Sequence, residues 1–275
     1  MIIGQVGVQS GCVSTAGDDL YYEVRGEGEP LLMISGGGGD AGFFSSVADI
    51  LSDEYKVITY DRRGNSRSTC NEPQNFEISQ QSRDAVAVIK AAGEDSAFVF
   101  GNSGGAVIAL DMAKTQPQAV RAAIVHEPPV MRVHPDRKTW QRFFAAVYWI
   151  GHMFGGNLAM LAFALPTGIP KSGYKSVPED TAKRMGKNHD FFVKNEMLPF
   201  SNYQPDLEAI KRNGVEVVMV AGKMTLDKRK FYGETAPIIA KQLGCEMAVF
   251  PGHHLSYMEQ PQEWAATLRG ILRKS

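Results

Sequence analysis

Short apolar segments of strand length alternate with longer segments of helical period through most of the 275 residues. This alternation is typical of β–α–β units on a largely parallel sheet. We expect the strands LYYEVRG and PLLMIS, which flank the turn GEGEP, to form an antiparallel hairpin. The sequence therefore predicts an α/β fold with a mostly parallel, doubly wound sheet. The expected strands are residues 20–26, 30–35, 56–61, 97–101, 122–127, 215–222 and 246–252, and the expected helices are residues 43–52, 76–92, 104–115, 229–243 and 261–273.

The alternation stops between Pro128 and about Tyr203, where aromatic and methionine side chains accumulate. We interpret this stretch as a helical insertion between two strands, with most of its apolar side chains packed onto the main domain. The predicted domains are a core of residues 1–130 and 204–275 and a helical cap of residues 131–203. A cap of this composition is expected to line an apolar pocket with its underside. The candidate pocket residues in it are Trp140, Trp149, Met153 and Phe154.

Charge and cysteine content narrow the possible partners and compartments. The chain has 29 basic and 30 acidic residues, a net charge of −1, so we expect no nucleic acid and no membrane among its partners. The N-terminal stretch lacks a basic region, and no run approaches 18 apolar residues, so we expect a cytoplasmic protein. Cys12, Cys70 and Cys245 are widely spaced and fit neither a disulfide framework nor a zinc site, so we expect them to be reduced and buried.

A serine stands in a glycine-rich turn between an expected strand and an expected helix. The turn reads Gly101-Asn102-Ser103-Gly104-Gly105, which matches G-x-S-x-G. Small neighbours allow a sharp strand-to-helix turn that exposes a nucleophile. The N–H of Gly104, at the start of the helix, is placed to stabilise a developing negative charge. We therefore predict Ser103 as a nucleophile.

Two other interpretations of this turn compete with a nucleophile. A phosphate-binding loop is disfavoured, because GNSGGA lacks both the G-x-G-x-x-G spacing and a Lys-Ser/Thr pair. A serine that only caps the following helix remains the structural alternative. A nucleophilic serine needs a base, so the decision depends on a partner elsewhere in the chain.

Six histidines are available as that base, and two of them have the most suitable position. His253 and His254 follow the last expected strand and precede the last helix, where a loop lies at the carboxyl edge of an open α/β sheet. His134, His152 and His189 fall in the insertion and are interpreted as surface or packing residues. The base is thus narrowed to the histidine pair.

In order and spacing, several segments resemble the α/β-hydrolase superfamily, and the resemblance covers nearly the whole chain. They are SGGGGDAGFF, DRRGNSRS, GNSGG, HEPP and PGHHLSYMEQP. The resemblance implies an eight-stranded sheet. It also selects His254, five residues before Glu259, as the base, and it implies an oxyanion hole of the Gly36 and Gly104 N–H groups beside a pocket residue Gly37. By the same resemblance, Asp61, Arg62 and Gly64 have a structural role in their turn.

The acid departs from the commonest pattern of the superfamily. Its members usually carry an Asp after the seventh strand, where this chain has Thr225, and Asp227 comes two residues late. Glu127 ends the strand after the serine turn, and a carboxylate there is able to orient a histidine from a neighbouring strand. This placement resembles that of the fungal zearalenone lactonases. We predict Glu127 as the acid and retain Asp227 as the alternative.

The resulting hypothesis is a serine hydrolase that cleaves a hydrophobic carboxylic ester or lactone through an acyl-enzyme, with Ser103, His254 and Glu127 as catalytic residues. No metal or organic cofactor is expected, and a homodimer is left open. Two alternatives use the same residues, namely carbon–carbon bond hydrolysis and cofactor-free perhydrolase (haloperoxidase-like) chemistry. A third is a ligand-binding receptor of the same fold. Dehalogenase and epoxide hydrolase chemistry are disfavoured, because both need an aspartate in place of Ser103.

Overall fold

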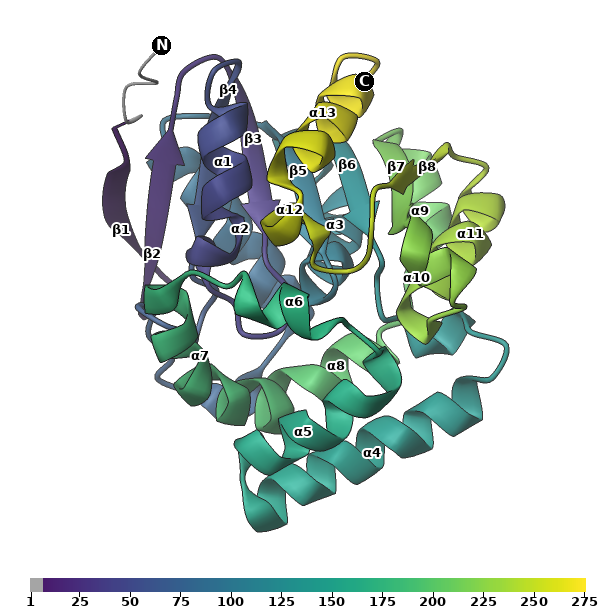
Figure 1. The fold of residues 1–275 in the computed structure, drawn as a ribbon. Helices are drawn as coiled ribbons and strands as arrows, with labels where there is room; N and C mark the ends of the chain where they lie inside the picture. Colours follow the sequence, from purple (N-terminus) through teal and green to yellow (C-terminus); the bar gives the residue numbers. More distant parts are fainter. Residues whose placement is uncertain (1–6) are drawn as a thin grey trace.

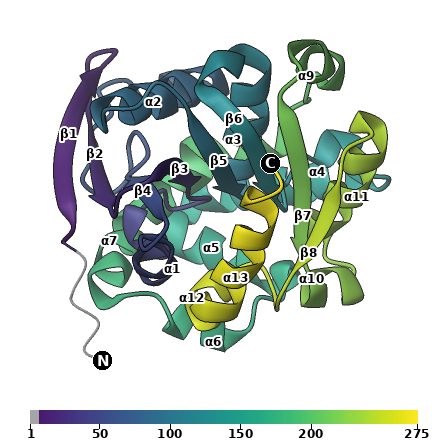
Figure 2. The same ribbon diagram turned by 90° about the horizontal axis from the view of Figure 1, so that it is seen from above.

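The computed structural model describes residues 7–275, which form one eight-stranded sheet with helices on both faces (Figures 1 and 2). The strand order is β1-β2-β4-β3-β5-β6-β7-β8, and β3 to β8 run parallel to one another. The predicted α/β fold is therefore confirmed. The strands are β1 (Gln9–Thr15), β2 (Asp18–Arg25), β3 (Glu29–Ile34), β4 (Tyr55–Tyr60), β5 (Ala97–Asn102), β6 (Val120–His126), β7 (Glu216–Gly222) and β8 (Met247–Phe250).

The expected hairpin between residues 20–26 and 30–35 is wrong. Strand β2 pairs antiparallel with β1 and β4, whereas β3 pairs parallel with β4 and β5. The antiparallel hairpin is instead β1–β2, whose turn residues Ala16 and Gly17 both have positive φ, as a tight two-residue hairpin turn requires. Strand β1 escaped prediction because its burial pattern runs from exposed to only half-buried positions, with no buried residue.

Helices cover each face of the sheet and enclose two apolar cores. On one face α2 (Ile78–Ala91), α3 (Gly104–Thr115), α9 (Leu207–Asn213) and α11 (Phe231–Leu243) supply buried side chains, and on the other α1 (Ser45–Leu51), α12 (Ser256–Glu259) and α13 (Pro261–Leu272) do so. The central parallel strands are almost wholly buried, as strands covered on both faces must be. Short 3₁₀ helices span Ala41–Phe44, Pro73–Asn75, Pro117–Ala119 and Met131–Val133, and α10 spans Lys223–Asp227.

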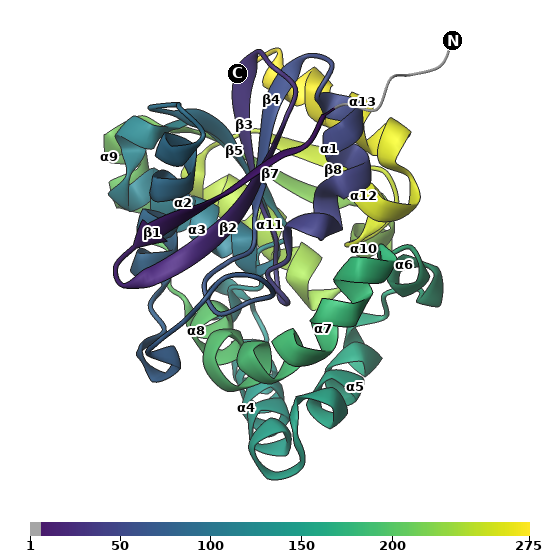
Figure 3. The same ribbon diagram turned by 90° about the vertical axis from the view of Figure 1, so that its left-hand side faces the viewer.

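The stretch between β6 and β7 is helical. It contains α4 (Arg137–Phe154), α5 (Gly156–Thr167), α6 (Lys171–Lys175), α7 (Glu179–Phe191), a π-helical turn η5 (Phe192–Glu196) and α8 (Met197–Asn202), which we call the insertion. Figures 1 and 3 show these helices gathered below one end of the sheet, with α4 and α5 farthest from it. An apolar cluster that joins α4, α5, η5 and α8 to Phe231 and Tyr232 of α11 holds the insertion against the core.

The cysteines are free, but the expectation that all are buried is wrong. Cys12 lies exposed on β1, and Cys70 and Cys245 are half-buried. Burial raises the pKa of the Cys70 and Cys245 thiols. None of the described helices combines the length and apolarity needed to cross a membrane.

Candidate active site

Ser103 stands between β5 and α3 in a strained backbone conformation. Its φ is +56°, a region that residues with a Cβ rarely occupy. The Ser103 N–H donates to the carbonyl oxygen of His126 at 2.9 Å, which fixes the turn to the neighbouring strand. Gly105 follows the serine where a Cβ would lie 2.1 Å from the Ile34 oxygen, so only glycine lets α3 approach β3 this closely. Strain held in place in this way is typical of functional positions.

Glu127 and His254 contact each other directly. The Nδ1 of His254 lies 2.5 Å from Oε2 of Glu127, and the other carboxylate oxygen accepts the N–H of Gly222 at 2.8 Å. Glu127 also has a positive φ, +52°, and is completely buried. Burial alone would raise the pKa of Glu127, but the imidazoles of His126 and His254 and the Gly222 N–H outweigh it and lower that pKa. Glu127 is thus an anion that accepts the imidazole N–H.

The alternative acid does not reach His254. Asp227 lies at the end of α10, is 61% exposed and pairs with Lys223 at 2.9 Å. Thr225, in the place where an acid is usual, is buried instead, with its methyl group against Gly233 beside Glu127. The structure therefore brings Glu127, and not Asp227, to the histidine.

The two adjacent histidines point to different partners. His253 Nε2 lies 2.6 Å from Oε2 of Glu259, and its backbone N–H donates to the Ser256 hydroxyl. His254 alone of the pair contacts Glu127 and lines the pocket with Ser103. Its ring packs against Tyr232, with centroids 4.6 Å apart.

His126 is a further buried imidazole next to the acid, and its place at the site was not predicted from the sequence. Its Nδ1 lies 2.7 Å from the amide nitrogen of Asn102, so Nδ1 accepts and the ring proton is on Nε2. Burial lowers the pKa of His126 to about 4, so its ring is neutral near pH 7. The ring stacks on His254 with centroids 5.9 Å apart. The sequence did contain a signal for this histidine, because His126 ends the strand β6 and directly precedes the predicted acid Glu127.

His126, Glu127 and His254 also form a group of potential metal ligands within the described residues, with one ligand atom of each inside 4.8 Å of the others. The Glu127–His254 hydrogen bond already uses two of these atoms. A cation there would have to displace the shared proton, so the arrangement as it stands suits a proton better than a metal.

The loop after β3 packs against the serine. A Cβ on Gly36 would lie 2.6 Å from the Cβ of Ser103, and one on Gly37 would lie 2.8 Å from the Phe192 ring. Arg62 fixes this loop, because its Nε donates to the Ser35 oxygen at 2.9 Å and its Nη2 to the Gly36 oxygen at 2.7 Å. Gly36 and Gly104 therefore both adjoin Ser103, and their N–H groups are the candidates for binding an oxyanion.

Arg62 also ties this loop to the insertion. Its guanidinium forms two hydrogen bonds with Glu196 of η5, at 2.6 and 2.8 Å, and both side chains are completely buried. Two residues of α7 add further links, since Arg184 pairs with Asp40 and Asn188 donates to the Gly38 oxygen. The Arg62 turn thus has a structural role, because its buried ion pair with Glu196 joins the core to the insertion.

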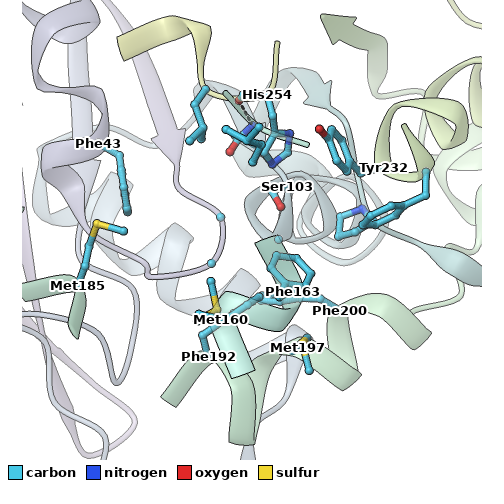
Figure 4. A pocket seen from close by; sticks show the side chains of 18 of the residues that line it. Phe43, Ser103, Met160, Phe163, Met185, Phe192, Met197, Phe200, Tyr232 and His254 are labelled. Carbon is cyan, nitrogen blue, oxygen red and sulfur yellow. Dashed lines mark hydrogen bonds between the residues drawn. The ribbon is translucent and has the colours of Figure 1, made fainter. Parts of the chain in front are cut away.

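An apolar pocket of about 110 Å³ opens over Ser103 (Figure 4). Ser103 and His254 form its polar end, and in the described part of the chain no Asp, Glu, Lys or Arg lines it. The apolar wall comes from both the core and the insertion. Its members include Phe43, Phe144, Met160, Phe163, Met185, Phe192, Met197, Phe200, Phe231 and Tyr232.

Most of the pocket residues expected from the sequence are corrected. Gly37 lines the pocket, but Trp149, Met153 and Phe154 are exposed on the outside of the insertion. Trp140 stacks on Phe231 with centroids 4.2 Å apart and lies behind the pocket wall. The helical period of α4 could have predicted which of its residues face solvent. Phe144, Val147 and Gly151 mark the buried side of the helix, and residues 149 and 153 fall on the opposite side.

Comparison with known proteins places these features in a family. The sequence model of the alpha/beta hydrolase fold matches residues 29–151. The chain is 30% identical to the uncharacterized hydrolase YraK of Bacillus subtilis over 97% of both chains, and 24% identical to the zearalenone hydrolase of Bionectria ochroleuca over 89% of this chain and 90% of that one. Among solved structures, a thermophilic esterase from Thermogutta terrifontis superposes with a TM-score of 0.78 at 19% identity, over 97% of this chain and 98% of that one.

Proposed function

Since the chain belongs to the α/β hydrolase family and is a hydrolase, we propose that it cleaves a carboxylic ester or lactone of a small hydrophobic molecule. The observation that carries this proposal is a single pocket in which Ser103 and His254 are the polar end of an apolar cavity, with Glu127 2.5 Å behind the histidine. This combination of residues supports acyl transfer to serine.

In the first half of the reaction, His254 Nε2 takes the proton of the Ser103 hydroxyl as the oxygen attacks the substrate carbonyl carbon. The N–H groups of Gly36 and Gly104 hold the negative charge that develops on the carbonyl oxygen. The carbon–oxygen bond to the alcohol then breaks, and His254 returns the proton to the leaving oxygen. An acyl group remains on Ser103.

In the second half, His254 removes a proton from water, and the resulting nucleophile attacks the acyl-enzyme and releases a carboxylic acid. Glu127 accepts the Nδ1–H of His254 throughout, so that Nε2 is free to act as the base and the imidazolium is stabilised when it forms. The lowered pKa of Glu127 supports this role, because the carboxylate stays ionised at neutral pH.

The pocket supports an uncharged and small substrate. Its lining carries no charged carboxylate, amine or guanidinium within the described residues, so a charged group would enter at a desolvation cost. A volume of about 110 Å³ is below the roughly 150 Å³ of an apolar cavity that holds benzene. We therefore propose that the insertion acts as a cap that favours short acyl chains or small lactones.

The same residues serve other reactions, and the names of relatives bear on the choice. The relative named zearalenone hydrolase supports a lactone, and the structural neighbour described as an esterase supports a simple ester. Carbon–carbon bond hydrolysis and perhydrolysis remain the alternatives with the same residues. A receptor without activity is disfavoured, because binding alone would not require the strained backbone of Ser103 and Glu127.

Ser103→Ala tests the proposal. With p-nitrophenyl acetate and butyrate, the wild-type protein should release a burst of nitrophenol, and the variant should release none while its thermal unfolding stays unchanged. Ser172→Ala, at an exposed residue of α6, is the matched control and should keep full activity. Retained activity in Ser103→Ala would refute the serine mechanism. A panel of aryl esters, small lactones, diketones and a peracid assay then assigns the reaction.

A further inference from the structure

Large apolar side chains gather on the outer face of the α4–α5 helical hairpin. Of the eight exposed large hydrophobic residues in the described chain, six lie between residues 149 and 165; the other two are Val8, just before β1, and Val249 on β8. Trp149 is 60% exposed and Leu165 is 80% exposed. The six side chains, which we call the outer hairpin face, are Trp149, Met153, Phe154, Leu158, Leu161 and Leu165.

The hairpin has two apolar sides, although a surface helix normally has one. Its inner side supplies Phe144, Met160 and Phe163 to the pocket wall. Helix α5 contains no charged residue from Gly156 to Thr167, a composition typical of a helix that is covered all round. The outer hairpin face exposes on the order of 600 Å² of apolar surface, at the upper end of what monomers leave uncovered.

The distribution of charge permits a second copy of the chain to cover this face. No acidic residue occurs from residue 137 to residue 178, and Arg137, Lys138 and Arg142 are exposed at the start of α4. They precede Trp149 by 7 to 12 residues, which is about 10–18 Å along a helix. If two copies meet about a two-fold axis near the Met153 end, with their α4 helices antiparallel, their basic ends lie more than twice that distance apart. Screening in physiological salt acts over about 8 Å, so these charges do not oppose the pairing.

A membrane fits the same face less well. Three bases lie at the start of α4, and Lys230, which donates to the Pro166 oxygen, adds a fourth near Leu165, while the whole chain has a net charge of −1. An anionic bilayer would thus gain little electrostatic attraction. The exposed area, in contrast, is close to the roughly 800 Å² per partner that a stable protein interface buries.

We propose that the outer hairpin face binds the same face of a second copy of this chain, so that the two α4–α5 hairpins form a four-helix layer about a two-fold axis. The interface covers Trp149, Met153, Phe154 and the three leucines of α5. Because the inner side of the same helices forms the pocket wall, the dimer also holds that wall in place. The proposal does not depend on the reaction that the pocket performs.

Sedimentation velocity between about 1 and 100 µM tests the proposal. The wild-type protein should sediment as a dimer. In the double variant Leu161→Glu/Leu165→Glu, the dissociation constant of the dimer should rise at least 100-fold, so that the protein sediments as a monomer. The reason is that two glutamates from each copy would place four carboxylates in one interface. Val249→Glu, which alters an exposed apolar residue on β8, is the matched control and should remain dimeric.

Two results would overturn the proposal: a wild-type monomer at every concentration, or a double variant that dimerises like the wild type. Flotation with phosphatidylserine–phosphatidylcholine vesicles tests a membrane as the other occupant. If the wild-type protein is a monomer that binds vesicles, and the double variant does not bind them, the face belongs to a membrane. Should the double variant fail to fold, Phe154→Cys in a Cys12→Ser background decides. It should cross-link to itself across the axis with a short bis-maleimide, and its failure to do so counts against the dimer.

Discussion

The Nδ1 atom of His254 lies 2.5 Å from Oε2 of Glu127, although the two residues are 127 positions apart in the chain. Glu127 directly follows β6, the strand next to the one that leads to Ser103, and does not lie in the turn after β7. The carboxylate therefore approaches the histidine from the end of the strand beside the serine, and the last residue of β7, Gly222, donates its N–H to it.

Glu127→Gln should reduce kcat for p-nitrophenyl butyrate by about 10³–10⁴, because an amide in place of the carboxylate favours the wrong tautomer of His254. Asp227→Asn, a matched loss of one carboxylate at an exposed site, should change kcat by less than twofold. Steady-state kinetics on both variants checks this. A far larger loss in Asp227→Asn would mean that the acid is assigned wrongly.

Gly36→Ala should lower kcat by about 10²–10³, the usual effect of losing one oxyanion donor. The added Cβ would lie 2.6 Å from the Ser103 Cβ, so the loop that carries the N–H must move away. Gly186→Ala is the control, since a Cβ there meets nothing within 4 Å on helix α7. If kcat in Gly36→Ala stays at the wild-type value, the Gly36 N–H has no part in the reaction.

Glu196→Gln should lower the free energy of unfolding by about 3 kcal/mol, because it leaves the buried Arg62 cation without its anion. Glu208→Gln removes a carboxylate from the exposed pair with Lys211 and should cost less than about 0.5 kcal/mol. Urea unfolding at pH 7.5 measures both. Equal stability of the two variants would show that the Arg62–Glu196 pair does not hold the insertion to the core.

The stability of the protein should fall with acid in part through His126. Its pKa is about 4 in the folded protein and about 6.5 when unfolded, so below pH 6.5 the unfolded chain gains a proton that the folded one does not. The contribution of the neutral ring is complete above pH 6.5 and is lost as the pH falls towards 4, a change of about 3 kcal/mol.

In His126→Gln this contribution is absent, so unfolding free energies measured by urea between pH 7 and 4.5 should depend less on pH than in the wild type. His152→Gln, at an exposed position of α4, should retain the wild-type slope. A wild-type slope in His126→Gln would mean that His126 is already protonated in the folded state or solvated.

Local patterns in the sequence predicted the parallel sheet and its main helices, because buried strands and amphipathic helices each bear their own periodicity. They did not predict that β2 pairs with β4, since strand pairing depends on the whole topology and not on the length of the GEGEP turn. The short spacing between β2 and β3 favoured a hairpin, but β3 pairs with two parallel neighbours, β4 and β5, and so is not paired with β2.

At the candidate site, the motifs led to Ser103, His254 and Glu127, and the structure places the last two in contact. Composition alone misassigned the pocket wall, because aromatic residues on the two sides of α4 look alike in a sequence. The role of Glu196 could not be predicted from the sequence. A lone glutamate within the insertion does not indicate that Arg62, 134 residues earlier, is its partner.

The place of Glu127 in the chain has a consequence for recombination between family members. Ser103 and Glu127 both precede the insertion and His254 follows β8, so the whole segment from α4 to α8 is a cassette bounded by two junctions that contain none of these three residues. A grafted cassette has to meet two charge conditions: a carboxylate in the place of Glu196 to neutralise Arg62, and a cation in the place of Arg184 to neutralise the buried Asp40. With both conditions met, insertions that form pockets of different shape become exchangeable on the same core.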